Sequence, residues 1–217
     1  MHRTLYFLID CSRSMRGVKG DAVNSLMRKV VDEGVPEIKA AKSEDFKISI
    51  MALGYSGVAG SGVFEIIPKT DIENLAGWKP VAFDKFGGGA PAGAAIDWVV
   101  REIEGGSRGD PDPQMLCPLI VLIAGGEPDG GSPTYEETLQ FAAKGGDREI
   151  KSFRKSFRIA LGIGVDEKGR ESLKKFGGIS RKMEEEGRLS YFDCSKQNFD
   201  DFIGEIKDIT FWHNRNI

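Results

Sequence analysis

The sequence has few of the residues that build metal clusters and disulfide frameworks. Its 217 residues include three cysteines and two histidines. The odd number of cysteines, the absence of any CxxC spacing and the placement of His2 and His213 near the chain ends argue against a zinc site or a disulfide framework. We expect reduced, structural thiols at or near strand ends. The cysteines are Cys11, Cys117 and Cys194.

Long apolar runs and a strong net charge are also missing. The longest apolar run, LCPLIVLIAGG, is too short to cross a bilayer and is interrupted by Pro118. The N-terminus lacks the long apolar stretch and the small-residue cleavage site of a signal peptide. A net charge of -3 at pH 7 gives no general attraction to nucleic acid. These absences predict a cytoplasmic protein that binds neither membranes nor nucleic acid.

Short apolar runs alternate with helical patterns along most of the chain. Apolar residues make up 40% and charged residues 29% of the sequence, which is typical of a globular protein. The runs rich in Ile, Val, Leu and Phe predict strands, because strands buried on both faces show no polar alternation. The predicted strands are residues 4–9, 46–53, 63–67, 119–124, 157–163 and 189–192.

Several helices have clear start or stop signals. Residues 18–33 repeat apolar side chains at the helical period, and we expect Gly34 and Pro36 to end that helix. A second helix should begin at Pro91 and end before Gly105. The last helix is expected to be capped by Asn198. Its predicted inner face comprises Phe199, Phe202, Ile203, Ile206 and Ile209. Weaker helical signals cover residues 134–155 and 168–176, and residues 181–188 predict an exposed loop or short helix.

The alternation of strands and helices predicts one α/β domain over residues 1–217. Buried strands with intervening helices indicate a doubly wound, mainly parallel six-stranded sheet. The connection GYSGVAGSG is too short for a crossover helix, so one strand should be an antiparallel edge strand. In such sheets ligands bind beyond the carboxyl ends of the strands. Three loops are expected to meet there: residues 10–17, 85–93 and 124–131.

These three loops resemble those of the von Willebrand factor A (vWA) family. LIDCSRSMRG resembles the D-x-S-x-S loop of the family, GGGAPAGAAI resembles its G-G-T-P-x-G loop, and PLIVLIAGGEPDG resembles its P-x-I-x-L-x-T-D-G-E-P loop. The similarity is greatest to the bacterial cytosolic branch typified by the TerY tellurium-resistance proteins. It implies a Rossmann-like vWA fold with a metal-ion-dependent adhesion site (MIDAS). In such a site, an acidic side chain of a partner completes the coordination of a bound Mg²⁺ or Mn²⁺.

Only part of the family's ligand set is present. Asp10, Ser12 and Ser14 match the first loop, whereas Ala90 and Gly125 stand where the family has threonine and aspartate. Ala124 likewise replaces the third loop's threonine. A single carboxylate leaves much of the charge of a divalent ion uncompensated. We therefore expect a degenerate site with no high-affinity cofactor, while weak binding of Mg²⁺ or Mn²⁺ stays open.

Several roles remain open for the residues around Asp10. Glu127 and Asp129 could reach back toward a metal ion directly or through water. Arg13 or Arg16 could pair with Asp10 in place of the metal, or both could simply be exposed to solvent. Asp10 could also shape its turn by accepting backbone N–H groups.

The resemblance implies a noncatalytic protein–protein interaction module. Its expected partner-binding face contains Arg13, Arg16, Ala90, Gly125, Glu127 and Asp129. The TerY branch implies a bacterial stress-response or defence setting, with a protein kinase or a metal-dependent protein phosphatase as partner. One alternative is a weak metal-dependent adhesion module completed by a partner carboxylate. Another is a phosphatase-like enzyme with Asp10 as nucleophile, although Ser12 replaces the second aspartate of its D-x-D motif.

A basic segment, residues 147–158, interleaves cationic and aromatic side chains. Such a pattern can bind single-stranded nucleic acid. In an acidic chain it more readily indicates a solvated helix face with Phe153 and Phe157 turned inward. Its cations are Arg148, Lys151, Arg154, Lys155 and Arg158. The glycine run at 87–89 lacks the lysine of a phosphate-binding loop, and we expect it to be a flexible lead into a helix.

Overall fold

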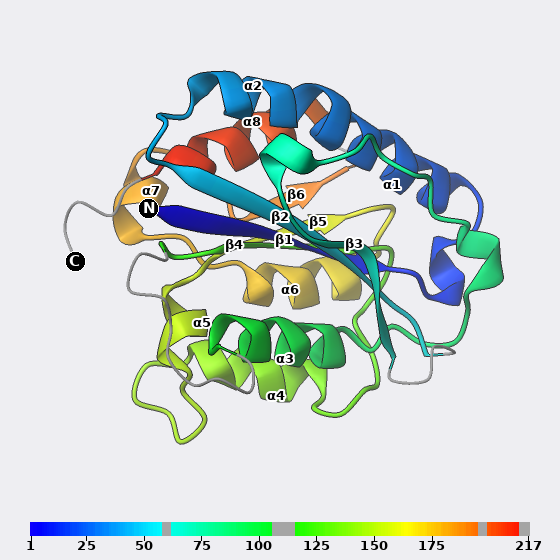
Figure 1. Ribbon diagram of the computed structural model, residues 1–217. Coiled ribbons are helices and arrows are strands. Elements are labelled where there is room, and N and C mark those ends of the chain that lie inside the picture. Colours follow the sequence, from blue (N-terminus) through cyan, green and yellow to red (C-terminus); the bar gives the residue numbers. More distant parts are fainter. Residues whose placement is uncertain (58–61, 106–115, 195–198, 213–217) are drawn as a thin grey trace.

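A six-stranded sheet with helices on both faces forms the protein (Figure 1). The computed structural model describes residues 1–57, 62–105, 116–194 and 199–212. The strand order is β3-β2-β1-β4-β5-β6, and every pairing is parallel except that of β3 with β2. The strands are β1 (His2–Asp10), β2 (Lys47–Tyr55), β3 (Val63–Asp71), β4 (Leu119–Ala124), β5 (Phe157–Gly162) and β6 (Tyr191–Asp193). The predicted fold class, with one antiparallel edge strand, is confirmed.

Each face of the sheet packs against its own group of helices. Along β1, Leu5 and Phe7 lie in one apolar core and Tyr6 and Leu8 in the other, because successive side chains of a strand point to opposite faces. The first core is covered by α1 (Val18–Lys29), α2 (Val35–Ala41), α7 (Arg181–Glu185) and α8 (Phe199–Phe211). The second is covered by α3 (Ala92–Ile103), α4 (Tyr135–Leu139), α5 (Lys151–Lys155) and α6 (Glu167–Phe176). Shorter helical turns are η1 (Arg13–Met15), η2 (Val30–Gly34), η3 (Ile72–Asn74), η4 (Phe83–Lys85) and η6 (Gln140–Ala142). Across the described ranges, no helix has the length and apolar character needed to cross a membrane.

The prediction that Gly34 and Pro36 end the first helix is wrong. The chain passes from α1 through the π-helical turn η2 directly into α2. The N–H of Val35 donates to the carbonyl oxygen of Val30, five residues back, so the helical path continues through a wider turn. Pro36 follows this wider turn, where the i→i−4 hydrogen-bond pattern is already interrupted, so its missing N–H is tolerated.

Two larger differences concern the predicted helical region at 134–155 and the edge strand, whereas the bounds of the other strands differ by at most two residues. Residues 134–155 are not one helix: α4 and η6 are separated from α5 by turns in which Gly145 has a φ of 75°. Strand β3 extends past residue 67 to Asp71, through Pro68. An edge strand tolerates proline, and a register shift of the β2 pairing lies at this point. The predicted cap Asn198 lies outside the described residues, and α8 begins at Phe199.

The first strand is tied to the last helix by a buried arginine. Arg3, 1% exposed, donates from its guanidinium to the carbonyl oxygens of Ile209 at 2.5 Å, Thr210 at 2.6 Å and Trp212 at 2.7 Å. These carbonyls lie at the end of α8, where helix carbonyls lack intrahelical partners. Burial lowers the pKa of Arg3 to about 10. Sequence reasoning did not single out this residue.

The cysteines lie where the sequence predicted. Cys11 directly follows β1 and is buried, Cys117 precedes β4, and Cys194 follows β6. All three are free thiols.

Candidate functional site

The three loops predicted to meet do lie at one end of the sheet. We call them the first loop (residues 10–17), the second loop (residues 85–93) and the third loop (residues 124–131). They follow β1, lead into α3 and follow β4, at the end of the sheet opposite to the N-terminus (Figure 1).

Backbone hydrogen bonds join the loops to one another. The N–H of Arg13 in the first loop donates to the carbonyl oxygen of Gly88 in the second, at 3.2 Å. The N–H of Asp129 in the third loop donates to the carbonyl oxygen of Ala90, at 3.0 Å. In return, the N–H of Ala90 donates to the Asp129 carboxylate. The second loop is thus held from both sides.

Asp10 bridges the first and third loops from a buried position. It is 0% exposed, and its Oδ1 accepts the N–H of Ser12 at 2.7 Å. Its Oδ2 accepts the N–H of Gly125 at 3.2 Å. Burial raises the pKa of Asp10 and dominates over the hydrogen bonds from Ser12 and Gly125, which act in the opposite direction. The arrangement is that of a turn-shaping carboxylate.

The two serines of the first loop lie side by side. Ser12 Oγ and Ser14 Oγ are 2.9 Å apart and share a hydrogen bond. Ser12 is buried and Ser14 is exposed. With Asp10, they place three oxygen-bearing side chains within five consecutive residues.

The third loop has no carboxylate at the expected position, and other side chains surround that position. A β-carbon added to Gly125 would lie 2.1 Å from Sδ of Met15 and 3.2 Å from Cδ of Lys19. The Lys19 ammonium donates to the carbonyl oxygen of Gly125 at 2.5 Å. A thioether and a cation therefore border the place where the resemblance of the loops implies a second anionic ligand. Sequence reasoning missed both residues, and nothing in their local pattern marks them.

The acidic residues further along the third loop face other partners. Glu127 forms an ion pair with Lys168 at 2.8 Å. Asp129 accepts the N–H of Ala90, as described above. Neither carboxylate makes a hydrogen bond to the first loop in the part of the chain that the structure describes. Reaching back toward Asp10 would require these contacts to break.

The two arginines of the first loop are exposed. Arg16 donates from Nε at 3.1 Å and from Nη2 at 2.5 Å to the carbonyl oxygen of Phe86. Arg13 is exposed to solvent. Among the described residues, no ion pair joins either guanidinium to Asp10. Of the residues expected on the partner-binding face, Ala90 and Gly125 are buried, so their side-chain positions are not available for contact.

This set of oxygen ligands does not fit a tight octahedral magnesium site. Magnesium gives up its waters reluctantly and needs charged oxygen ligands to replace them. The site has one buried carboxylate whose two oxygens already accept N–H groups, together with two neutral hydroxyls. Over the residues that the structure describes, no group of three or more His, Cys, Asp or Glu side chains could hold a metal ion.

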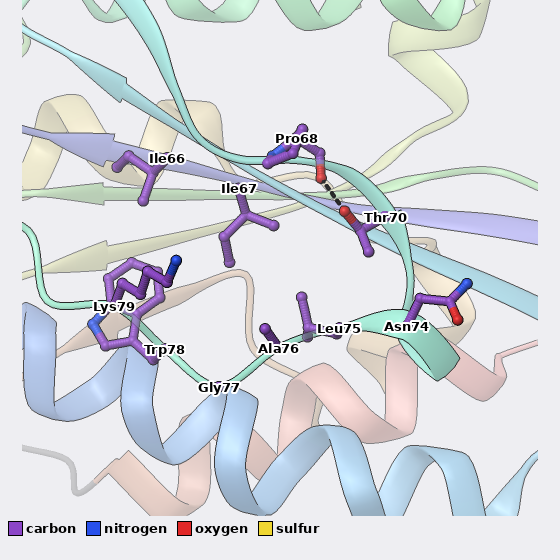
Figure 2. A pocket seen from close by; sticks show the side chains of 10 residues that line it. All are labelled: Ile66, Ile67, Pro68, Thr70, Asn74, Leu75, Ala76, Gly77, Trp78 and Lys79. Carbon is purple, nitrogen blue, oxygen red and sulfur yellow. Dashed lines mark hydrogen bonds between the residues drawn. The ribbon is translucent and has the colours of Figure 1, made fainter.

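A separate cavity of about 240 Å³ lies beside the edge strand β3 (Figure 2). Apolar side chains of Ile66, Ile67, Leu75 and Trp78 line it. Thr70, Asn74 and Lys79 are its polar side chains. This lining is mainly apolar, and Lys79 is its charged side chain.

The basic segment at 147–158 is only partly the solvated helix face that the sequence suggested. Phe153 and Phe157 are buried, as expected. Arg158, however, is 8% exposed and belongs to strand β5, so its assignment to a solvated face was wrong.

Comparison with known proteins finds similar folds and no similar sequences. No protein-family model matches the chain, and no curated protein matches it. The pilus adhesin SpaC from Lactobacillus rhamnosus GG superposes with a TM-score of 0.62 at 13% identity, over 96% of this chain and 30% of its own. Proximal thread matrix protein 1 from the mussel byssus superposes with a TM-score of 0.57 at 15% identity, over 97% and 47%.

A second structure of the mussel protein, with a zinc-occupied MIDAS motif, superposes with a TM-score of 0.54 at 13% identity, over 97% of this chain and 47% of its own. At such identities the likenesses show the fold alone. This chain spans less than half the length of each of these structures.

Proposed function

We propose that this chain is a noncatalytic protein–protein interaction module that binds a partner protein through the three loops and does not depend on a tightly bound metal ion. One observation carries the proposal. The loops are hydrogen-bonded to one another around the buried Asp10, and they leave the charged side chains of Arg13, Arg16, Glu127 and Asp129 exposed. A preorganised, charged and exposed surface suits protein recognition.

The proposed partner presents a carboxylate to the first loop. In vWA proteins with a complete MIDAS, an acidic side chain of the partner completes the coordination shell of the metal ion. Here Arg13 and Arg16 supply positive charge on the same loop, and a guanidinium matches a carboxylate through two parallel hydrogen bonds. Arginine would then take over the metal's role in recognition.

The proposed setting follows from the resemblance of the loops to the TerY branch. We place the protein in the cytoplasm of a bacterium, in a stress-response or defence system of the tellurium-resistance type. A protein kinase or a metal-dependent protein phosphatase is the proposed partner. The three free cysteines agree with a reducing compartment.

Site-specific crosslinking in the native host tests the proposal. A photo-crosslinking residue at Ser14 should capture a protein partner both with magnesium and with EDTA. The variant Arg13→Glu/Arg16→Glu should lose the crosslink, whereas Arg181→Glu, an exposed arginine on α7, should keep it. A crosslink that needs magnesium, or that survives the double charge reversal, contradicts the proposal.

A metal-dependent version of the same module is the second candidate. The hydrogen-bonded hydroxyls of Ser12 and Ser14, two and four residues after Asp10, favour it, since these residues match the first-loop ligands of a MIDAS. The mussel protein with a zinc-occupied MIDAS motif gives it further support. Calorimetry with MgCl₂ and MnCl₂ separates the candidates. Heat of binding only in the presence of the partner favours this version, and no heat in either case favours the metal-independent one.

The geometry of Asp10 supports a noncatalytic role. A nucleophilic carboxylate must expose an oxygen to the substrate, yet both Asp10 oxygens accept backbone N–H groups in a buried position. A generic phosphatase assay should give the same background rate for the wild type and for Asp10→Asn. Activity that disappears in the variant would establish the enzymatic alternative instead.

A further inference from the structure

A second cavity, of about 190 Å³, lies at the opposite end of the sheet from the three loops. Strand β5 begins there, between α5 and α7 (Figure 1). At this cavity, the end of the basic segment lies against residues 178–180, which come later in the sequence. Arg158 and Gly178 exchange backbone hydrogen bonds at 2.7 and 2.9 Å. The lining consists of residues 154–158 and 178–180.

Arg158 is a buried cation without an anionic partner. Its Nη1 donates to the carbonyl oxygen of Phe153 at 2.7 Å and, more weakly, to the carbonyl oxygen and Oγ of Ser156 at 3.4 Å. Its Nε donates to the carbonyl oxygen of Phe176 at 3.1 Å. The guanidinium also lies over the Phe153 ring, 4.9 Å from the centroid. Within the described chain, no carboxylate forms an ion pair with Arg158 and no acceptor is bonded to its Nη2. Since an uncompensated buried charge is costly, an anion in the cavity would be favourable.

Other lining groups add positive charge and a hydroxyl. Lys155 is exposed and has no ion-pair partner among the described residues. Arg154 forms an ion pair with Glu149, which offsets one of the three positive charges. Ser180 Oγ accepts the N–H of Met183 at 3.3 Å, which leaves its hydrogen for an acceptor in the cavity. Two positive charges and several donors therefore remain for a ligand.

We propose that this cavity binds the phosphoryl group of a phosphate monoester. Such a group carries close to two negative charges at pH 7, which matches the charge that remains. Its oxygens suit the planar donors of arginine. The cavity is a single site, whereas nucleic acid is bound along a series of phosphate and stacking contacts. The phosphoryl group could come from a small free ester or from a phosphorylated side chain of a partner.

Calorimetric titration of the full chain at constant ionic strength tests the site. The probes are inorganic phosphate, O-phosphoserine, a short phosphoserine peptide and a single-stranded oligothymidylate. Saturable binding of the phosphate probes is expected. Equal affinity for O-phosphoserine and the peptide identifies a small ester as the source, and tighter binding of the peptide identifies a partner side chain.

Matched variants of one helix locate the binding. Lys155→Ala should weaken binding of O-phosphoserine at least ten-fold, which corresponds to about 1.4 kcal/mol. Lys151→Ala, an exposed lysine one turn earlier on α5 and outside the cavity, should change it less than about two-fold. Arg158→Lys keeps the charge but removes the planar donors, and it should also weaken binding ten-fold if its melting transition stays cooperative.

Three results would overturn the site. They are the absence of saturable binding for every phosphate probe, an equal loss in Lys151→Ala and Lys155→Ala, and tighter binding of the oligonucleotide than of O-phosphoserine. If Arg158→Lys does not fold, the comparison of the two lysine variants decides. The site is independent of the three loops, so Arg13→Glu/Arg16→Glu should leave phosphate binding unchanged.

Discussion

Sδ of Met15 lies 2.1 Å from the point that a β-carbon on Gly125 would occupy. The first loop therefore uses space that an aspartate side chain in the third loop would need. The N–H of Gly125 meanwhile donates to Asp10, so the two loops remain joined by the backbone although the second carboxylate is missing. The absence of this ligand is accompanied by packing that closes the position.

Restoring the missing oxygen ligands should make the free energy of unfolding depend on magnesium. In Ala90→Thr/Gly125→Asp, a second carboxylate near Asp10 and the displacement of Met15 should lower the free energy of unfolding by about 2 kcal/mol in EDTA. Magnesium at about 100 times its Kd should raise it by about 2.7 kcal/mol. Urea denaturation in MgCl₂ and in EDTA measures both effects.

The control for this experiment is Ala90→Thr alone, which adds a hydroxyl without charge. The wild type and this control should respond to magnesium by less than about 0.5 kcal/mol. An equal response of the wild type and the double variant would mean that one carboxylate is enough to hold the ion.

Removing the Arg3 guanidinium should strongly destabilise the protein. Arg3→Met leaves three carbonyl oxygens at the end of α8 without their donor, and we expect the free energy of unfolding to fall by about 3 kcal/mol. Arg13→Met, the same substitution at an exposed site, should change it by less than about 0.5 kcal/mol. Urea denaturation of the two variants makes the comparison, and similar losses would argue against this role for Arg3.

Two helical glycines should respond in opposite directions to alanine. A β-carbon at Gly93 would lie 2.3 Å from the carbonyl oxygen of Pro133, which is backbone and cannot move away cheaply. Gly93→Ala should lower the free energy of unfolding by about 2 kcal/mol or more. Gly204→Ala on α8 has nothing within 4 Å and should raise it by about 0.5–1 kcal/mol. Thermal melting of both variants suffices, and a shift in the same direction would contradict this reading of the packing.

Glu205 should make stability decrease as the pH rises. Burial raises the pKa of Glu205, although Arg188 lies 3.6 Å away and acts in the opposite direction. Between the unfolded pKa and this higher folded pKa, the native state binds more protons than the unfolded state. The free energy of unfolding should therefore fall as the pH rises through this window.

Glu205→Gln should lose this contribution, so its stability relative to the wild type should increase from pH 4 to pH 7 in urea denaturation. The exposed Glu186→Gln serves as the control, since it removes the same charge from the surface. A constant difference between Glu205→Gln and the wild type across this range would assign the pH dependence to other groups.

Most of the fold could be predicted from local patterns. Residues 119–124 form β4 with the predicted bounds, because a short run that is apolar at every position is compatible with a central strand buried on both faces. The meeting of the three loops also followed from the sequence, since parallel strands direct their carboxyl ends to one edge. The boundary at Gly34 and Pro36 failed because a π-helical turn accommodates both residues, which local helix-stop rules do not represent.

The sequence by itself determined the strand and helix alternation, the single carboxylate of the first loop and the absence of its usual companions. These properties depend on residue type and on spacing within short segments. Only the tertiary structure decided that Met15 and Lys19 border Gly125, that Arg3 meets the end of α8, and that Arg158 is buried beside a cavity. The first two contacts join residues more than a hundred positions apart. The burial of Arg158 depends on contacts with Phe176 and Gly178, which follow β5 in the sequence. Such contacts arise from the packing of whole elements, which local composition does not encode.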